Sequence, residues 1–395
     1  MISDLHIHSR FSRACSKAIT FENLVKWARI KGLHLLGTGD FTHPIWFKEI
    51  KEKLIEKKGL YYYDDFPFII TGEISLIYTQ ERGRKVHLVV LVPSVEIAEK
   101  IHSYLDKKGR RDYDGRPIFK ISCEQFVKDM IEISEDIEVI PAHIWTPYFG
   151  VFGSMSGFDS LKEAFGTQVK HIHAIETGIS SDPDMNIKIK ELRDKSIVSF
   201  SDAHSFWPYR LGREATIFKK ADSYGEILEQ IRNNSFIATI ETDPAYGKYH
   251  YDGHRLCNFS CSPEKTKQLN GVCPICGRSL TLGVDYRVEK LSNGEEPETK
   301  KYYTLLPLHE IISLSFGVGM QSKKVWAVYN SLIDLFKNEF EILLNVSREK
   351  FIEKNVNAKL IGLILKNRGG NIRVKPGYDG VYGKALLSET QATLY

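Results

Sequence analysis

The chain has 395 residues, of which 42% are hydrophobic and 26% charged, as in an ordinary globular protein rather than a disordered or fibrous one. No apolar run approaches the length of a membrane span, and the first residues lack the pattern of a signal peptide. We therefore expect a cytoplasmic protein with no membrane partner. A net charge of +4 does not by itself indicate a nucleic-acid partner.

Strand and helix patterns alternate through the first 245 residues. The opening MISDLHIH is typical of a short strand. A helix follows it, for which Thr20 is the expected N-cap and Gly32 the expected C-terminal stop. The strand pattern HLLGTGD comes next, and the alternation continues to SIVSFSDAH and the helix YGEILEQIRNN. This order predicts parallel strands in an α/β barrel or sheet.

Two further regions follow the barrel, so we predict three domains. The barrel takes residues 1–245. Residues 246–300 are rich in turn residues and cysteine, which is typical of a small metal-stabilised module. Residues 301–395 are predicted to be a helical domain that ends in a basic, glycine-rich tail.

A histidine or a carboxylate stands at the end of nearly every predicted barrel strand. Such ends carry the functional residues of α/β barrels. The two-residue period of a strand places His6 and His8 on one face, where both can bind one ion. Imidazole and carboxylate groups suit zinc, manganese or iron. A single histidine is more often structural, but the repetition across strands favours a metal centre. The residues are His6, His8, Asp40, Glu73, His87, His143, Glu176, Asp202 and His204.

The motifs HIH, TGD, GE, PAH and SDAH, in this order and with the lone His87 between the third and fourth, resemble the polymerase-and-histidinol-phosphatase (PHP) phosphoesterase family. The resemblance implies a distorted (β/α)7 barrel with two or three divalent ions of zinc, manganese or magnesium. It implies that a first ion is held by His6, His8, Glu73 and Asp202. It implies that a second ion is held by Glu73, His87 and His143.

The resemblance also implies a third ion, held by Asp40 and His204. Two features depart from the family pattern there. Asp40 stands where many members have histidine, and the stretch SRFSRACSK lacks the histidine that completes this site in many members.

Four cysteines crowd into one short stretch of the second region. Two close cysteine pairs can close a tetrahedral zinc site, and CPICG is typical of a zinc knuckle. Unrelated buried cysteines do not explain the spacing, and a redox CxxC leaves the first pair unexplained. We predict a structural zinc ion for which the nearby His250 and His254 are not needed. The predicted ligands are Cys257, Cys261, Cys273 and Cys276.

The C-terminal region favours a nucleic-acid substrate over a small phosphate ester. The tail interleaves basic groups, which neutralise phosphates, with tyrosines, which stack on exposed bases. The stretch SFGVGMQSKKV is a glycine-rich turn into a helix start, which suits a backbone phosphate. A solvated basic surface explains each patch alone about equally well. The predicted DNA-binding residues are Lys323, Lys324, Arg368, Arg373, Lys375, Tyr378 and Tyr382.

Two loops are expected on the same rim as the metal ligands. The aromatic loop after His143 could wall a pocket for a flipped base or pack as a lid, through Trp145, Phe149 and Phe152. In the loop HSFWPYRLGREAT, Arg210 and Arg213 could hold phosphate oxygens or pair with an acid. The predicted catalytic residues are Glu73, Asp202, His204, Arg210 and Arg213.

The same loops, together with YHYDGHRLC, CPICG and PGYDGVYG, resemble the endonuclease Q family over essentially the whole chain. The resemblance implies a DNA-repair endonuclease that cuts 5′ of a deaminated base (uracil, hypoxanthine or xanthine) or an abasic site. It implies metal-activated water, base flipping and a double-stranded DNA partner. We expect a monomer associated with the nucleoid, and no peptide at the C-terminus indicates recruitment by a sliding clamp.

Two other functions remain compatible with the sequence alone. A PHP phosphatase acting on a small phosphomonoester would use the same ligands. A non-catalytic DNA-binding scaffold would use the metals only to hold its shape, although the near-complete ligand set argues against it.

Overall fold

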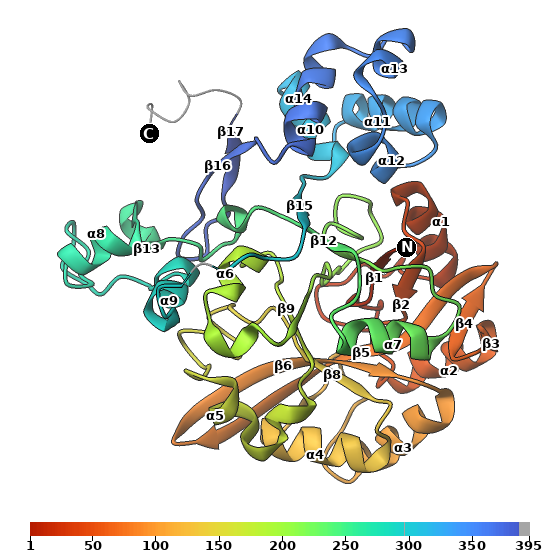
Figure 1. Ribbon diagram of the computed structural model, residues 1–395, viewed down its shortest axis with the longest axis vertical. Helices are drawn as coiled ribbons and strands as arrows, with labels where there is room; N and C mark the ends of the chain where they lie inside the picture. The colour runs from red at the N-terminus through yellow and green to blue at the C-terminus, as the bar shows by residue number, and fades with distance from the viewer. Residues whose placement is uncertain (296, 387–395) are drawn as a thin grey trace.

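A computed structural model describes residues 1–295 and 297–386, and seven of its strands form the centre of the fold (Figure 1). The strands are β1 (Ile2–Asp4), β2 (Leu35–Gly37), β5 (Phe66–Gln80), β6 (Arg82–Val92), β8 (Glu138–Pro141), β9 (Ala174–Glu176) and β10 (Ser196–Val198).

These strands close into a distorted barrel, as the sequence predicted. Strands β1, β2 and β5 are parallel neighbours, and so are β9 and β10. Strand β6 runs antiparallel to both β5 and β8, and this reversal is the distortion. Beyond the strand ends, the Ile144 amide donates to Glu176 O at 3.1 Å, and the His8 amide donates to Ala203 O at 2.9 Å. These two hydrogen bonds join β8 to β9 and β10 to β1, which completes the circle.

Helices cover the outside of the barrel. Helix α1 (Phe21–Lys31) begins at Thr20, whose side chain accepts from the Asn23 amide, and ends at Gly32 with a φ of 93°. Both predicted caps are therefore confirmed. The other covering helices are α2 (Pro44–Lys53), α3 (Val95–Asp106), α4 (Cys123–Ile133), α5 (Leu161–Phe165), α6 (Pro183–Ile187) and α7 (Tyr224–Arg232).

Short strands pair with β5 and with β1 and extend the sheet outside the barrel. Strands β3 (Ile55–Lys57) and β4 (Leu60–Tyr63) pair beyond β5, and β7 (Ile118–Phe119) also pairs with β5. On the other side β1 is followed by β11 (Ala215–Ile217), β12 (Ala238–Glu241) and β15 (Tyr302–Thr304). Strand β15 lies beyond the cysteine-rich segment in sequence, so residues 302–304 belong to the sheet and not to the helices that follow.

The cysteine-rich segment forms a small lobe at the side of the barrel (Figure 1). It contains the hairpin β13 (Asp252–His254) and β14 (Phe259–Cys261), followed by α8 (Pro263–Gln268) and α9 (Val284–Leu291).

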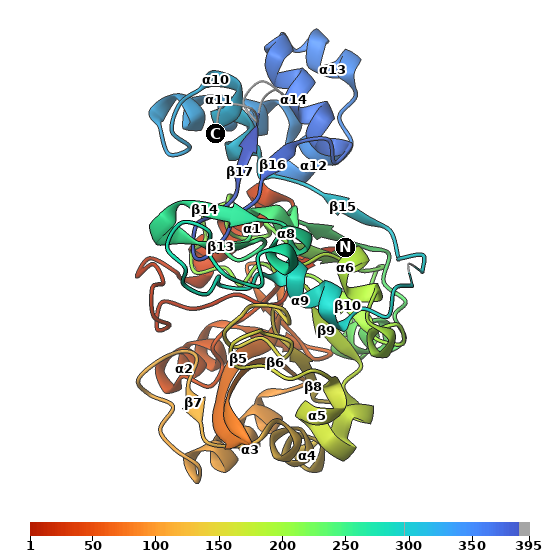
Figure 2. The same ribbon diagram turned by 90° about the vertical axis from the view of Figure 1, so that its left-hand side faces the viewer.

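Helices α10 to α14 form a separate layer at the end of the barrel near α1 (Figure 1). They are α10 (Leu308–Phe316), α11 (Lys323–Phe336), α12 (Glu339–Leu344), α13 (Arg348–Glu353) and α14 (Ala358–Arg368). The hairpin of β16 (Arg373–Lys375) and β17 (Lys384–Leu386) then runs from this layer back to the cysteine-rich lobe, as Figure 2 shows. Among the described residues, none of the helices has the length and apolar character needed to cross a bilayer.

Candidate active site

Two groups of buried side chains meet at the mouth of the barrel. In the first group, His6, His8, Glu73 and Asp202 each offer one ligand atom, and these atoms lie within 4.8 Å of one another. In the second, Glu73, His87 and His143 meet the same limit. Because Glu73 belongs to both, the two groups form one continuous centre. These are the first two ligand sets that the PHP resemblance implied.

The strand ends that carry this centre adopt an uncommon backbone conformation. Asp40, His143 and Asp202 have φ values of 45°, 30° and 49°. A non-glycine residue in this region is strained by about 1–3 kcal/mol and persists where its surroundings fix it. Here the strain turns each side chain sharply inward at the end of a strand.

Carboxylate and hydroxyl groups behind the histidines fix the direction of each ring. His6 Nδ1 lies 2.9 Å from Glu176 Oε1, His8 Nδ1 lies 2.9 Å from Asp40 Oδ1, and His143 Nδ1 lies 3.0 Å from Thr146 Oγ1. A partner on Nδ1 leaves Nε2 as the atom that points toward the centre. This is the usual arrangement behind metal-binding histidines.

One buried atom of the centre has no hydrogen-bond partner. His6 Nε2 is 3.7 Å from the Glu73 carboxylate and 3.6 Å from that of Asp202, and it makes no hydrogen bond among the described residues. An unpaired polar atom in a buried site is unfavourable. A divalent cation would satisfy this atom and both carboxylates together, so the residues present fit a bound metal.

The electrostatics of the centre also fit cations. Burial alone would lower the pKa of His6, but the carboxylates of Glu176 and Glu73 raise this pKa well above its ordinary value. Burial alone would raise the pKa of Glu73, but His87, Arg116 and His6 lower it well below its ordinary value. The carboxylates therefore stay ionised and favour a proton on His6, and a metal ion that binds the same groups would displace that proton.

The implied third ion is not supported, because its expected ligand Asp40 is already engaged. Asp40 Oδ2 accepts from the Ser9 amide at 2.6 Å, from Ser9 Oγ at 2.6 Å and from Ser12 Oγ at 2.9 Å. Its other oxygen holds His8, and the side chain is fully buried. No metal-binding group among the described residues contains Asp40 or His204. Asp40 is therefore an orienting partner of His8.

A pocket of about 850 Å³ opens beside the centre. His204 lies on its wall, where Nδ1 donates to Asp202 O at 2.8 Å and Nε2 has no hydrogen bond among the described residues. Arg210 is exposed on the same wall and has no side-chain partner in the described part of the chain. Other lining residues are Cys15, Thr146, Tyr148, Asp202, Tyr249 and Tyr382.

Arg213 also lines this pocket, and an acid far along the chain engages it, which is the alternative that the sequence left open beside a phosphate contact. Its guanidinium is 2.5 Å from Glu310 of α10 and donates to Thr242 Oγ1 at 3.1 Å. Only 7% of its side chain is exposed. Arg213 therefore ties the barrel to the helical layer, while Arg210 is left to face a ligand.

The aromatic loop after His143 lines the pocket with Thr146 and Tyr148, but its Trp145 and Phe152 pack inward. Trp145 and Phe152 are almost fully buried and contact one another, and Trp145 Nε1 donates to Asn186 Oδ1 at 2.8 Å. These two residues are not among those that line the pocket, so of the two alternatives the packed arrangement fits them better than the pocket wall. The Phe149 ring lies 4.1 Å from that of His87 and covers one side of the second ligand group.

Sequence reasoning missed one charged residue of the centre. Arg116 Nη1 donates to Glu73 Oε2 at 3.0 Å, and 22% of the Arg116 side chain is exposed. It comes from the loop between α3 and β7, which carries three arginines and two aspartates within seven residues. Nothing in that pattern distinguishes Arg116 from its neighbours.

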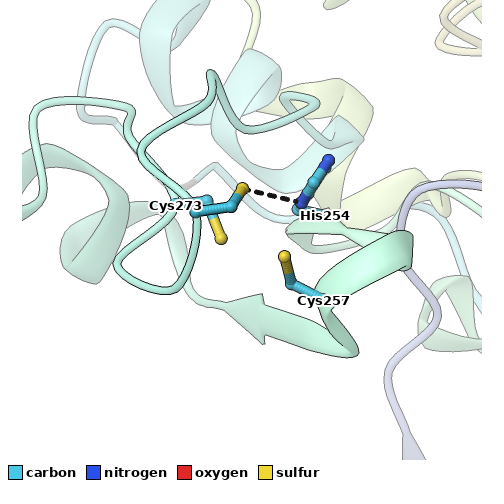
Figure 3. Close-up of side chains that lie close together, drawn as sticks. His254, Cys257 and Cys273 are labelled. Atoms are coloured by element: carbon cyan, nitrogen blue, oxygen red, sulfur yellow. Dashed lines mark hydrogen bonds between the residues drawn. The ribbon is translucent and has the colours of Figure 1, made fainter.

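The cysteine-rich lobe contains a third ligand group, and its membership differs from the prediction. Ligand atoms of His254, Cys257, Cys273 and Cys276 lie within 4.8 Å of one another. Figure 3 shows the first three of these side chains pointing into one space, and Cys276 Sγ lies 3.4 Å from His254 Nδ1. Three thiolates and one imidazole form a closed tetrahedral set that suits structural zinc. His254 thus takes the place predicted for Cys261.

Hairpin register explains this exchange. His254 stands opposite Phe259, whereas Cys261 stands opposite Asp252 at the far end of the hairpin. Cys261 Sγ instead lies 3.3 Å from Thr266 Oγ1. Spacing in the sequence cannot reveal which residue of a hairpin reaches the turn.

The residues predicted to bind DNA divide into two classes. Arg368 donates to the carbonyls of Leu343, Ile342 and Val346, so it closes the end of α12 instead of facing outward. Tyr378 is 7% exposed and donates to Asn258 Oδ1 at 2.7 Å within the cysteine-rich lobe. The exposed members are Lys323, Lys324, Arg373, Lys375 and Tyr382, of which Tyr382 stands at the pocket.

Comparisons with known proteins cover different parts of the chain. Residues 307–371 match the family described as the MJ0043 C-terminal domain. The uncharacterized protein MJ0043 of Methanocaldococcus jannaschii is 34% identical over 301 residues, which are 73% of this chain but only 36% of that protein. The uncharacterized protein YqxK of Bacillus subtilis is 26% identical over 406 residues, which cover 97% of this chain and 98% of that one.

Two crystal structures match over nearly the full length. The lesion-specific endonuclease PfuEndoQ of Pyrococcus furiosus matches with a TM-score of 0.88 and 30% identity, over 100% of this chain and 97% of that one. An endonuclease Q in complex with a 27-mer duplex substrate, which has an abasic lesion at the active site, matches with a TM-score of 0.87 and 30% identity. That match covers 99% of this chain and 98% of the other.

Proposed function

The chain belongs to the endonuclease Q family, and from this premise we propose that it is a DNA-repair endonuclease. It hydrolyses the phosphodiester bond on the 5′ side of a deaminated base or an abasic site in duplex DNA. Uracil, hypoxanthine and xanthine are the deaminated bases that we propose. The products are a 3′-hydroxyl and a 5′-phosphate.

The position of Glu73 in two ligand groups is the observation that carries this proposal. A carboxylate shared between two groups suits a pair of neighbouring divalent ions. When bound, such ions supply an activated water and stabilise the charge that develops on a phosphoryl group. His6, His8 and Asp202 would hold one ion with Glu73, and His87 and His143 would hold the other.

The protein's own groups position the substrate around this centre. Arg210 and Tyr382 lie on the pocket wall, where a guanidinium can hold phosphate oxygens and an aromatic ring can stack on a base. His204 Nε2 makes no hydrogen bond among the described residues. It can therefore exchange a proton with a phosphate oxygen or the leaving group. His204 and Arg210 reach the pocket from the loop after β10, and Tyr382 reaches it from the C-terminal hairpin.

The size of the pocket supports base flipping. About 850 Å³ is within the usual range for pockets that enclose a small ligand, so it can receive an extruded nucleotide. Extrusion costs least where pairing is already weak, as at an abasic site or a deaminated base, and this difference supplies part of the selectivity.

The test compares labelled duplexes that carry uracil, hypoxanthine, xanthine, an abasic site or no lesion, in the presence of Mg²⁺ or Mn²⁺. We expect cuts only in the lesion strand, at the bond 5′ of the lesion. His8→Ala and Asp202→Ala should abolish nicking while DNA binding survives, because each removes one member of the first ligand group. Uniform cutting of all duplexes, or full activity in either variant, would refute the proposal.

A further inference from the structure

The loop between α3 and β7 contacts the ligand centre through Gly115 and Arg116 and is held there by several hydrogen bonds. The Gly115 amide donates to Phe11 O at 3.1 Å, and Thr42 Oγ1 donates to Gly115 O at 3.2 Å. The Arg116 amide donates to Asp114 Oδ1 at 3.1 Å. The backbone on both sides of Arg116 is therefore fixed, and its side chain enters the centre from a rigid base.

This loop fills the space in which a third ion would lie. A Cβ atom on Gly115 would stand 2.2 Å from Asp40 Oδ2 and 2.4 Å from Ser12 Oγ, so the backbone presses directly on the Asp40 carboxylate. Only glycine allows this approach. Protein atoms, and not an open cavity, therefore face the oxygens that would have held a third cation.

The guanidinium of Arg116 supplies a positive charge in the same neighbourhood. It bonds Glu73, and Asp202 and Asp114 are the other acids close enough to favour its charged form. It also lies near enough to His204 and Cys15 to influence both electrostatically. His204, Cys15 and Asp202 line the pocket, so the guanidinium bonded to Glu73 lies in the neighbourhood of the pocket wall.

We propose that Arg116 is a catalytic residue that binds a non-bridging oxygen of the scissile phosphate in place of a third metal ion. A guanidinium has five N–H donors in a fixed fork, and Glu73 is the one described side chain that uses them. With 22% of its side chain exposed, Arg116 keeps part of this fork accessible to a ligand. A buried ion pair that served only to hold Glu73 would not need an open side.

Arg116 would act in two ways on the reaction. It fixes the orientation of Glu73, and it offsets the negative charge that builds on the phosphoryl oxygens as the bond to the leaving group breaks. Donors of this kind that are already in place typically contribute about 10²–10³-fold to turnover. This inference rests on the proposed nuclease function, since it assigns a contact to the phosphodiester of that substrate.

The test compares Arg116→Ala and Arg116→Lys with a matched control, Arg110→Gln. Arg110 lies in the same loop but is exposed and pairs only with Asp112. We expect Arg116→Ala to lower single-turnover nicking of an abasic-site duplex by about 10²-fold, and free guanidinium ion to restore part of it. Arg116→Lys should retain an intermediate rate, because it keeps the charge without the fork. Arg110→Gln should behave as the wild type.

Two readouts separate this role from that of a merely structural arginine. The metal content of Arg116→Ala should equal that of the wild type. Its affinity for the same duplex, measured without divalent metal, should fall about tenfold with the loss of one charged hydrogen bond. A loss of activity that extra metal fully reverses, without rescue by guanidinium, would mean that Arg116 only positions Glu73 and would overturn the inference.

The outcome also distinguishes the two proposals. A wild-type protein that cuts none of the lesion duplexes overturns the nuclease function and this inference with it. Lesion cutting by the wild type with undiminished turnover in Arg116→Ala overturns this inference alone.

Discussion

The ligand set of the cysteine-rich lobe can be tested by exchanging one sulfur at a time. We expect Cys261→Ser to keep its metal ion and its stability, whereas Cys257→Ser and His254→Ala lose the ion. The first two substitutions are chemically identical, so any difference between them reports only on position. They separate the ligand set seen in the structure, which contains His254, from the four-cysteine set that spacing predicts.

The geometry sets the size of the contrast. Ligand atoms around a tetrahedral zinc ion lie about 4 Å apart, because each bond to sulfur is about 2.3 Å long. Cys261 stands two residues along β14 from Phe259, the residue opposite His254, which places it about 7 Å farther along the hairpin. Its substitution removes one weak contact to Thr266, worth less than about 1 kcal/mol. Loss of a structural zinc ion removes roughly 10 kcal/mol or more of folding free energy from a small metal-bound lobe.

Metal content and limited proteolysis provide the assay. After dialysis against a weak chelator, the wild type and Cys261→Ser should retain equal amounts of zinc, while Cys257→Ser and His254→Ala release one ion per chain. The Cys257→Ser and His254→Ala proteins should then be cleaved by protease within residues 246–300, because the lobe has lost the metal ion that stabilises it. A zinc-free Cys261→Ser protein, or a His254→Ala protein that keeps its ion through Cys261, would refute the reasoning.

Three further predictions concern buried charges of the barrel. Glu176→Gln weakens the support behind the first metal ligand, so metal affinity in a titration should fall by about 10–100-fold, and an unchanged affinity would contradict this role. Lys31→Met leaves Glu339 buried without its cation, so the free energy of unfolding in urea should fall by about 3–5 kcal/mol. The double variant with Glu339→Gln should recover part of this loss. A fall of less than about 1 kcal/mol in the single variant would be inconsistent with this ion pair. Burial raises the pKa of Glu241 from 4.5 to about 8, so the folded state binds the extra proton between these values. Its contribution to stability is complete below pH 4.5 and is lost as the pH rises through about 8, and Glu241→Gln should flatten this part of the stability profile.

The sequence predicted which side chains gather at the barrel mouth because these residues obey strand geometry. His6 and His8 follow β1 with the spacing that puts both on one face, and PAH and SDAH end their strands in the same manner. What it could not predict depends on register and on contacts between distant segments. Asp40 has the chemistry of a ligand, and only the hydroxyls of Ser9 and Ser12 reveal that its oxygens are already engaged.

Long-range pairing also explains the other differences. Arg213 and Glu310 are separated by 97 residues, and no local pattern connects them. Trp145 and Phe152 pack against each other in the core. The sequence of their loop would be the same if these aromatic residues lined a pocket, so the sequence alone does not distinguish the two arrangements. Arg116 lies among other charged residues in its loop, and only the fold brings it to Glu73.

The helical layer, in which the sequence predicted DNA-binding residues, also holds part of the active-site rim in place. The loop that follows Asp202 and His204 carries Trp207, whose ring lies 5.2 Å from that of Trp27 on α1 and 5.3 Å from that of Trp326 on α11. The three rings pack edge to face, an arrangement that adds stability beyond their buried area. The rim loop is thus fixed between a barrel helix and a helix of the C-terminal layer.

Two ion pairs also connect the barrel to the helical layer beside this rim loop. Lys31 of α1 donates to Glu339 of α12 and to Pro208 O in the rim loop, both at 2.7 Å, and Arg213 at the end of that loop reaches Glu310 of α10. Removing the helices would strand two buried cations and release the segment that carries Arg210. Truncation after the barrel would therefore damage catalysis and DNA binding together. Point substitutions on the exposed faces, such as those at Lys323 and Lys324, are needed to separate a loss of DNA affinity from damage to the active site.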